Sequence, residues 1–373
     1  MNINPEMILI NFIKKGLRAI VIFIMLPVFM LISFLPTASA EELTVSTAPV
    51  YVDGQAYQTK YFLKDGQLMV PALFLKEAGA RVDWNEKYRS VVFRNGDVHF
   101  AAPVNKKYTD DLDKLTNTWK RVSLSTSPSF VREEIFVPIR DIATKLGMTV
   151  TYNSQLKRTL IETPTKRVSR RVAKGNTLQK YVALSFDDGP ESHYTPQILD
   201  ILKAKGVPGT FFVLGRQVQK YPEMLKRIVS EGHAIGNHTW SHRALPEITS
   251  SEVNNEIKKT QEEMFKTTGK RPDLFRPPFG ALTRSDEHLV YELGFRQIFW
   301  SVDTLDWTGN SAEEILTIVH RDITPGGIIL QHNIETDPDL LMGSIEALPK
   351  IIEQLQEKGY TFVTIQTLLD QTE

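Results

Sequence analysis

Apolar runs and helix-like segments alternate regularly from residue 181 to the end of the chain. The apolar runs occupy 181–186, 207–213, 233–237, 274–276, 296–302, 327–332 and 361–365. The helical patterns between them begin at Thr195-Pro196, Tyr221-Pro222, the box Thr249 to Glu252 and the box Ser311 to Glu314. Because parallel strands need helical crossovers, this alternation predicts an α/β fold, a distorted seven-stranded (β/α) barrel with its active site at the carboxyl ends of the strands.

A different pattern, present in two copies, fills residues 43–163. Each copy has a Val-Pro pair, a short helical stretch, a glycine and two strand-like runs. The first copy begins at Val70-Pro71 and the second at Val137-Pro138, with one extra residue in its helix. This repeat predicts a smaller α+β, β-rich domain built from two similar halves.

Two further segments flank this predicted domain. Residues 164–178 are polar and strongly basic, which predicts a linker before a last domain at 179–373, although contact with anionic wall polymers is an alternative. Lys14, Lys15 and Arg18 precede an uncharged run at 19–35, and small residues come just before Glu41. Residues 1–40 therefore predict an export signal, or else a retained membrane anchor, and in both cases the rest of the chain works outside the cytoplasm.

Composition narrows the chemistry. The length of 373 residues suggests two domains, and 42% hydrophobic with 24% charged residues is typical of a globular protein. The 44 basic and 44 acidic residues cancel, so no strong field favours a nucleic-acid partner. The chain contains no cysteine, which excludes disulfides and thiolate metal sites and leaves histidine and carboxylate as metal ligands.

Two adjacent carboxylates, Asp187 and Asp188, follow the first apolar run in the stretch Ser185 to Pro190. Like charges at the end of a buried strand repel each other, and a nearby cation relieves this repulsion. If Asp188 binds a metal while Asp187 stays free, the pair supplies both a ligand and a base. Asp-Asp-Gly-Pro is also an ordinary turn sequence, so the pair alone does not decide the matter.

Other polar groups follow the later strands. His238 and His242 follow the third apolar run, and in a helix their spacing of four would let them close on one ion. Two histidines and one carboxylate form the ligand set of a catalytic zinc site. The fourth run ends at Arg276, which could salt-bridge a carboxylate or belong to an ordinary loop. The sixth run ends at His332, a general acid or a satisfied core histidine.

Taken together, these stretches resemble the five motifs of the carbohydrate esterase family four polysaccharide deacetylases, with the NodB-homology domain. The stretches are Ser185 to Gly189, His238 to His242, Arg276 to Gly280, Asp303 to Trp307 and Leu330 to His332. They lie within 180–373 in the family's order, with Ser185 where threonine is commoner and Phe279 where tyrosine is. Residues 43–163 resemble the copper amine oxidase N-terminal-like domain, although His99 is the only histidine there and predicts no metal site.

The resemblance to the deacetylases implies a role for each matching residue. Asp188, His238 and His242 would bind the metal, and Asp187 would be the general base held by Arg276. Asp306 would orient His332, the general acid. The Phe279 N–H would stabilise the oxyanion, and Trp307 and Leu330 would form the wall of the pocket for the acetyl methyl group.

The expected activity is removal of the N-acetyl group from N-acetylglucosamine of a cell-envelope glycan, with peptidoglycan first, chitin or chitooligosaccharide second and acetylxylan third. A wall-binding protein that has lost its catalysis is the alternative from another class. Zn²⁺ is the expected cofactor, although cobalt, nickel and iron suit the same ligands. The expected partner is a glycan polymer, with association to the cell envelope and no nucleic acid. The aromatic residues Trp84, Tyr88 and Tyr152 could stack on sugars, but aromatics at this spacing more often belong to a core or interface.

Overall fold

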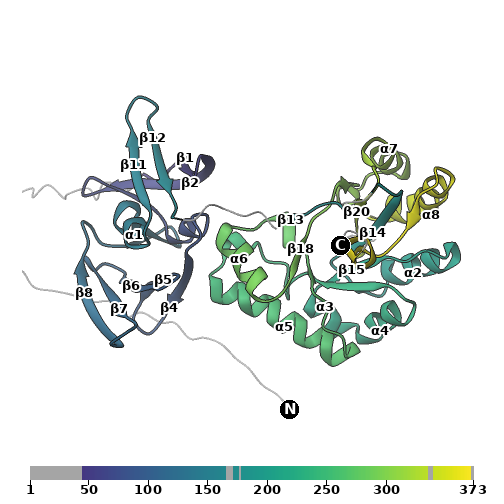
Figure 1. The fold of residues 1–373 in the computed structure, drawn as a ribbon, viewed down its shortest axis with the longest axis horizontal. Coiled ribbons are helices and arrows are strands. Elements are labelled where there is room, and N and C mark those ends of the chain that lie inside the picture. Colours follow the sequence, from purple (N-terminus) through teal and green to yellow (C-terminus); the bar gives the residue numbers. More distant parts are fainter. Residues whose placement is uncertain (1–43, 165–170, 176–177, 335–338, 371–373) are drawn as a thin grey trace, which may run out of the picture. The chain divides into compact units, whose positions relative to one another are not determined.

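The computed structural model describes residues 44–164, 171–175, 178–334 and 339–370 (Figure 1). The predicted export signal at 1–40 and most of the predicted linker, residues 165–170 and 176–177, lie outside these ranges. Within the described ranges, no helix is both long enough and apolar enough to cross a membrane.

The first part of the described chain contains a seven-stranded sheet in the order β11-β12-β1-β2-β3-β10-β9. All neighbours pair antiparallel except β1 and β12, which are parallel. Its strands are β1 (Ser46–Val52), β2 (Gln55–Lys64), β3 (Gln67–Pro71), β9 (Ser129–Val131), β10 (Glu134–Pro138), β11 (Thr149–Asn153) and β12 (Arg158–Glu162).

A five-stranded antiparallel meander follows the chain order β4-β5-β6-β7-β8. Its strands are β4 (Arg81–Asn85), β5 (Ser90–Asn95), β6 (Val98–Pro103), β7 (Tyr108–Asp113) and β8 (Thr118–Ser123). One face of the meander, including Phe93 and Phe100, packs in a core with η1 (Ala72–Lys76), α1 (Ile139–Lys145) and strands of the first sheet.

The two predicted copies of the repeat have the same succession of elements. β3, η1, β4 and β5 form the first, and β10, α1, β11 and β12 form the second. A glycine with positive φ, Gly79 or Gly147, follows the helix of each copy, because a left-handed backbone ends a helix most easily at glycine. β3 and β10 pair with Val70 opposite Val137. The extra residue of the second copy accompanies an α-helix where the first copy has a 3₁₀-helix.

The second part of the chain contains a nine-stranded sheet in which every pair is parallel, in the order β13-β18-β17-β16-β15-β14-β20-β19, with β21 also paired to β14. Its strands are β13 (Arg171–Val172), β14 (Tyr181–Asp187), β15 (Thr210–Val213), β16 (Ala234–Asn237), β17 (Leu274–Phe275), β18 (Arg296–Ile298), β19 (Val302–Asp303), β20 (Gly327–His332) and β21 (Thr361–Phe362).

The parallel α/β sheet confirms the predicted class, and it has nine strands where the sequence predicted seven. The expected strand at 296–302 divides into β18, beside β17, and β19, beside β20. Between them, the Phe299 N–H donates to the Val172 carbonyl and the Ser301 N–H donates to the Ile328 carbonyl. The chain therefore passes from one end of the sheet to the other at 299–301, and this exchange of partners breaks the strand.

Helices connect the parallel strands and cover them (Figure 1). They are α2 (Tyr194–Lys205), α3 (Gly215–Lys220), α4 (Pro222–Ser230), α5 (Ser250–Thr268), α6 (Arg284–Glu292), α7 (Ala312–Asp322), α8 (Met342–Glu357) and α9 (Ile365–Asp370), with 3₁₀ turns η2 (Leu245–Glu247), η3 (Pro278–Gly280) and η4 (Asp306–Thr308). Both predicted capping boxes are present, at Thr249 for α5 and Ser311 for α7. The main core joins β14 to residues of α2, α7 and α8.

One fully buried lysine joins segments far apart in the sequence. The Lys76 ammonium of η1 donates to the carbonyls of Leu245 and Ile248, both at 2.7 Å, and pairs with Asp286 of α6 at 2.9 Å. Burial lowers the pKa of Lys76 and raises the pKa of Asp286, and the two opposite charges partly offset this. The attraction between the two charges partly compensates for the hydration that each loses on burial.

Candidate active site

Asp187 is the last residue of β14 and faces away from the covering helices. Leu184 and Phe186 pack in the core with the helices, so strand alternation turns Ser185 and Asp187 to the opposite face of the sheet. The carboxyl group of Asp187 is only 3% exposed. In the parallel ladder between β14 and β20, Asp187 is the register partner of His332.

Arg276, fully buried after β17, holds the Asp187 carboxylate. Its Nη1 lies 2.7 Å from Asp187 Oδ1 and 2.9 Å from Ser185 Oγ, and its Nη2 donates to the Phe299 carbonyl at 3.1 Å. The guanidinium stacks over the Phe212 ring at 4.1 Å. Burial lowers the pKa of Arg276, and the charge of Asp187 counteracts this effect. Arg276 therefore supplies a positive charge and fixes the orientation of Asp187.

Three side chains, Asp188, His238 and His242, converge so that they could hold one metal ion. Asp188 Oδ1 lies 3.4 Å from His238 Nε2 and 3.3 Å from His242 Nε2, and all the ligand atoms lie within 4.8 Å of one another. Oδ1 of Asp188 is buried and has no hydrogen-bond partner among the described residues. An unpartnered buried carboxylate oxygen beside two imidazole nitrogens is the arrangement that a divalent cation completes.

The second nitrogen of His238 determines which atom faces Asp188. His238 Nδ1–H donates to the Arg276 carbonyl at 2.7 Å, so the lone pair of Nε2 points to the site. Burial lowers the pKa of His242. Burial opposes ionisation of Asp188, but the neighbouring imidazoles of His238 and His242 lower the pKa of Asp188 below its usual range. This chemistry of neutral imidazole and carboxylate donors fits a metal of the zinc type.

The segment from His238 to His242 is a loop, so the two histidines do not meet through the helical spacing considered from the sequence. Thr239 and His242 adopt positive φ values of 73° and 62°, which no helix allows. The Thr239 N–H donates to the side chain of Asn237 at 2.9 Å, and the His242 N–H donates to Thr239 Oγ1 at 3.2 Å. These local bonds turn the chain and bring both rings to one point, their centroids 5.1 Å apart.

Glu256 of α5 accepts hydrogen bonds from the same loop. Its Oε2 accepts the N–H groups of Trp240 at 3.0 Å and Ser241 at 2.8 Å, and its Oε1 accepts the Ser241 hydroxyl at 2.8 Å. Three hydrogen bonds to one carboxylate fix the backbone between the two histidines.

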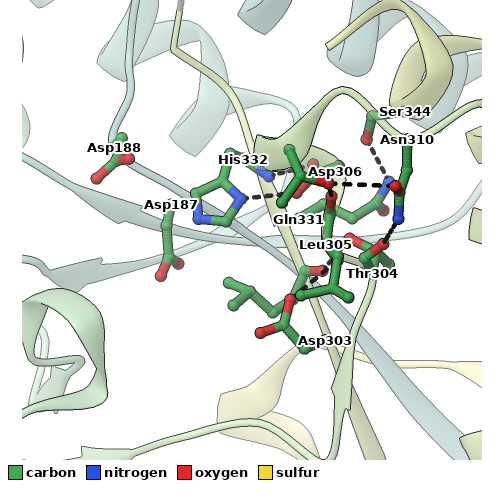
Figure 2. A network of polar contacts seen from close by, with 12 residues as sticks. Asp187, Asp188, Asp303, Thr304, Leu305, Asp306, Asn310, Gln331, His332 and Ser344 are labelled. Carbon is green, nitrogen blue, oxygen red and sulfur yellow. Dashed lines mark hydrogen bonds and ion pairs between the residues drawn. The ribbon is translucent and has the colours of Figure 1, made fainter. Parts of the chain in front are cut away.

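His332 and Asp306 form the second polar pair of the site (Figure 2). His332 Nδ1 lies 2.7 Å from Asp306 Oδ1, and the His332 backbone N–H donates to Asp306 Oδ2 at 2.8 Å. Burial works against the charged imidazole, but the charge and hydrogen bond of Asp306 raise the pKa of His332 to about 9. Figure 2 shows the His332 ring between Asp306 and Asp187. A protonated imidazole in this position can donate a proton.

The three other predicted site residues are Phe279, Trp307 and Leu330, which lie in η3, η4 and β20. Phe279 is in η3, 68% exposed, with its ring 4.6 Å from the His242 ring. Trp307 follows Asp306 in η4 and is 53% exposed. Leu330 is buried on β20, two residues before His332 and thus on the same face of the strand.

Several site residues other than glycine have left-handed backbones. Their φ values are 80° at Asp188, 73° at Thr239, 62° at His242, 58° at Phe279 and 54° at Leu305. Such conformations persist only where the surrounding structure imposes them.

Comparisons with known proteins identify families that this chain resembles. A family model described as Polysaccharide deacetylase matches residues 174–298, and one described as Copper amine oxidase N-terminal domain matches residues 51–161. Peptidoglycan-N-acetylglucosamine deacetylase of Bacillus cereus is 46% identical over 187 residues, which cover 50% of this chain and 67% of that relative. The chain belongs to the polysaccharide deacetylase family.

Two further polysaccharide deacetylases are similar to this chain. Peptidoglycan-N-acetylmuramic acid deacetylase PdaA of Bacillus subtilis is 38% identical over 203 residues, which cover 53% of this chain and 75% of that relative. The crystal structure of the Bc1960 peptidoglycan N-acetylglucosamine deacetylase matches with a TM-score of 0.52 and 43% identity, over 55% of this chain and 94% of that one. The matches to these three relatives cover 50%, 53% and 55% of this chain.

Sequence reasoning missed several residues that support the deacetylase site. Asn333 accepts the Gly189 N–H at 3.1 Å and donates to Thr195 Oγ1 at 3.0 Å, which fixes the turn after Asp188. Its position directly after His332 is a signal that could have found it. Glu256 carries no such signal, because it is one of several glutamates on α5 and lies 14 residues from His242 in the sequence.

Proposed function

We propose that this chain is a metal-dependent hydrolase that removes the N-acetyl group from N-acetylglucosamine residues of peptidoglycan and releases acetate. The observation that carries the proposal is the shared rung of Asp187 and His332 beside the cluster of Asp188, His238 and His242. The similarity to peptidoglycan deacetylases of Bacillus cereus and Bacillus subtilis supports the choice of substrate.

Asp188, His238 and His242 would hold the metal, and we propose Zn²⁺. Two imidazoles and one carboxylate would leave coordination positions open, as in catalytic zinc sites, and the same donor set also suits cobalt. When bound, the metal polarises the acetyl carbonyl and makes a coordinated water more acidic.

In the proposed mechanism Asp187 is the general base. It takes a proton from the attacking water, whose oxygen forms a bond to the acetyl carbon. The ion pair with Arg276 at 2.7 Å holds the Asp187 carboxylate in a fixed orientation before the reaction. The backbone N–H of Phe279 stabilises the negative charge that develops on the carbonyl oxygen.

His332 completes the proposed reaction as general acid. Its imidazolium, oriented by Asp306 at 2.7 Å, gives a proton to the amide nitrogen as the carbon–nitrogen bond breaks. Acetate leaves, and the sugar keeps a free amine. Trp307 and Leu330 form the wall that we propose for the acetyl methyl group.

A second candidate substrate is the N-acetylmuramic acid of the same polymer. The similarity to the muramic acid deacetylase of Bacillus subtilis, at 38% identity, favours it. Both candidates use the same acetamide chemistry and differ only in the sugar that enters the site.

Acetate release from purified peptidoglycan, chitin oligomers and acetylxylan tests the proposal. We expect release from peptidoglycan, and mass spectrometry of the digested glycan identifies the sugar that lost its acetyl group. Activity restricted to chitin oligomers or to acetylxylan would reject the proposed substrate. Absence of release from all three would favour a wall-binding protein without catalysis.

We further propose the domain division and the cellular location expected from the sequence. Residues 43–163 would form the repeat domain, 164–178 the linker and 179–373 the catalytic domain, exported by a signal at 1–40 and associated with the cell envelope. The separate hydrophobic cores at 50–161 and 182–362 support the division. N-terminal sequencing of the exported protein tests the signal, with Glu41 as the expected first residue.

A further inference from the structure

A large groove lies away from the candidate active site. It has a volume of about 1460 Å³ and runs over the five-stranded meander β4 to β8. A volume above the usual range of small-molecule pockets, roughly 300–1,000 Å³, suits a segment of polymer better than a single small ligand.

Strand alternation builds the floor of this groove. Val82, Phe93 and Phe100 turn into the core on one face of the meander. The residues between them face the groove, and one line of register partners crosses the sheet through Asp83, Val92, Ala101, Asp110 and Arg121. The groove therefore lies over one face of the sheet, which carries polar and aromatic side chains together with Val92 and Ala101, and Ser251 of α5 also lines it.

Aromatic rings lie along the groove. Trp84, Tyr88 and Trp119 are 37%, 64% and 53% exposed, and Tyr108 also lines it. The edge of His99 meets Trp119, with 5.6 Å between ring centroids. Exposed aromatic rings on a stable sheet offer flat apolar surfaces on which the C–H faces of sugar rings can pack.

The charge of the groove selects the kind of glycan. Five cationic side chains line it against two carboxylates, Asp83 and Asp110. These two carboxylates pair with Arg94 and Arg121. The remaining cations, Lys87, Arg89 and Lys106, are exposed and have no carboxylate partner among the described residues. An anionic ligand is thus complementary to the groove.

We infer that the meander face is a second binding site, which holds an anionic glycan by stacking sugar rings on Trp84, Tyr88 and Trp119 and by pairing its acidic groups with Lys87, Arg89 and Lys106. The identification of the glycan as a wall polymer rests on the proposed function. Carboxylates of peptidoglycan and phosphates of other wall polymers share this chemistry. The site would hold the polymer while the active site acts on it.

Binding of soluble glycan to the exported chain and its variants tests the inference. The probes are peptidoglycan strands freed of other polymers, a phosphate-bearing wall polymer and uncharged chitin oligomers. We expect Trp119→Ala to weaken binding of an anionic probe about tenfold, the loss of one good aromatic contact. Tyr152→Ala is the matched control, because Tyr152 is 57% exposed on β11, outside the groove, and binding should change less than about twofold.

A second variant changes the charge of the groove without removing an aromatic side chain, so its effect does not depend on packing within the domain. We expect Lys106→Glu to weaken binding about tenfold at low salt and less at high salt, whereas the exposed Lys157→Glu outside the groove should have little effect. Tight binding of either anionic probe that both groove variants weaken supports the inference and identifies the source of the charge. Binding that neither variant changes, or binding only to chitin oligomers, overturns it.

Acetate release from a short soluble N-acetylglucosamine oligomer separates this inference from the proposed function. Both groove variants should retain that activity, because the oligomer does not need the second site. Lost glycan binding with retained release would support the inference. Absence of release from every substrate, with intact binding, would reject the proposed function alone.

Discussion

Asp187 and His332 occupy the same rung of the parallel ladder between β14 and β20. Each is the last residue of its strand, so both side chains emerge at the same edge of the sheet. The proposed base and the proposed acid are therefore held at a fixed separation by backbone hydrogen bonds and not by loops. Arg276 and Asp306 then orient the two side chains from opposite sides.

Replacing the proposed base should stop turnover and spare the metal. Asp187→Asn keeps the shape of the side chain but cannot take a proton, so we expect acetate release to fall about 10²- to 10⁴-fold. Metal analysis of the same variant should give unchanged content, because the ligands are retained. Asp200→Asn, on the surface of α2, is the control. Unchanged activity of Asp187→Asn would reject the assigned role.

Removal of the metal should abolish activity, and zinc should restore it. Chelation should also lower the melting temperature, because a ligand at 100 times its dissociation constant stabilises the native state by about 2.7 kcal/mol. His242→Ala should remove the response of the melting temperature to zinc. His288→Ala is the control, since its side chain is 67% exposed and pairs with Glu292. A zinc response that survives in His242→Ala would contradict the assigned ligand.

The pH profile should report the pair of His332 and Asp306. Burial opposes the imidazolium, yet Asp306 raises the pKa of His332 to about 9, so His332 should stay protonated and active up to that pH. Asp306→Asn removes the charge, lowers the pKa of His332 and should move the alkaline limb of kcat/KM to lower pH. Asp322→Asn, on α7, should leave the profile in place. A profile that is the same in both variants would refute the assigned acid.

Glu256 should affect metal affinity without touching the metal. Glu256→Ala removes three hydrogen bonds to the loop between the two histidines, and we expect the zinc dissociation constant to rise about 10- to 100-fold. Glu256→Gln retains acceptor capacity and should recover part of the affinity. Glu262→Gln on the same helix, where Glu262 pairs with Arg271, is the control. Equal affinities in all three variants would show that the loop does not need Glu256.

The buried ion pair of Lys76 and Asp286 should contribute strongly to stability. Lys76→Met leaves the Asp286 carboxylate buried without its cation, which we expect to lower the free energy of unfolding by about 3–5 kcal/mol. The double variant Lys76→Met, Asp286→Asn should lose less, since no uncompensated charge remains. Denaturant unfolding measures both, with the exposed Lys60→Met as control. A double variant less stable than the single one would contradict this account.

Local signals in the sequence were sufficient for most of the fold. The apolar runs predicted β14, β15, β16, β17, β20 and β21, and the capping boxes predicted the starts of α5 and α7. The predicted site residues also follow strands of one sheet, because parallel strands bring all their carboxyl ends to one edge. Periodicity and capping depend on neighbouring residues, which is why the sequence alone reveals them.

The features that the sequence did not reveal share a different cause. The loop at His238 to His242 and the break between β18 and β19 depend on partners far away in the sequence: Glu256 for the loop, and the carbonyls of Val172 and Ile328 for the break. No local pattern encodes which distant carbonyl a strand will meet. Positive φ at Thr239 and His242 is equally hidden, because these residue types seldom adopt it without support from tertiary contacts.

The left-handed backbones at Asp188, Thr239, His242, Phe279 and Leu305 bear on any attempt to make this enzyme more heat-resistant. Each such residue raises the energy of the folded chain by about 1–3 kcal/mol, so relaxing one of them would be an easy route to a higher melting temperature. At Asp188, His242 or Phe279 the same relaxation would move a proposed metal ligand or the proposed oxyanion donor. Laboratory evolution that selects for thermal tolerance and activity together should therefore retain these five residues and introduce its substitutions elsewhere.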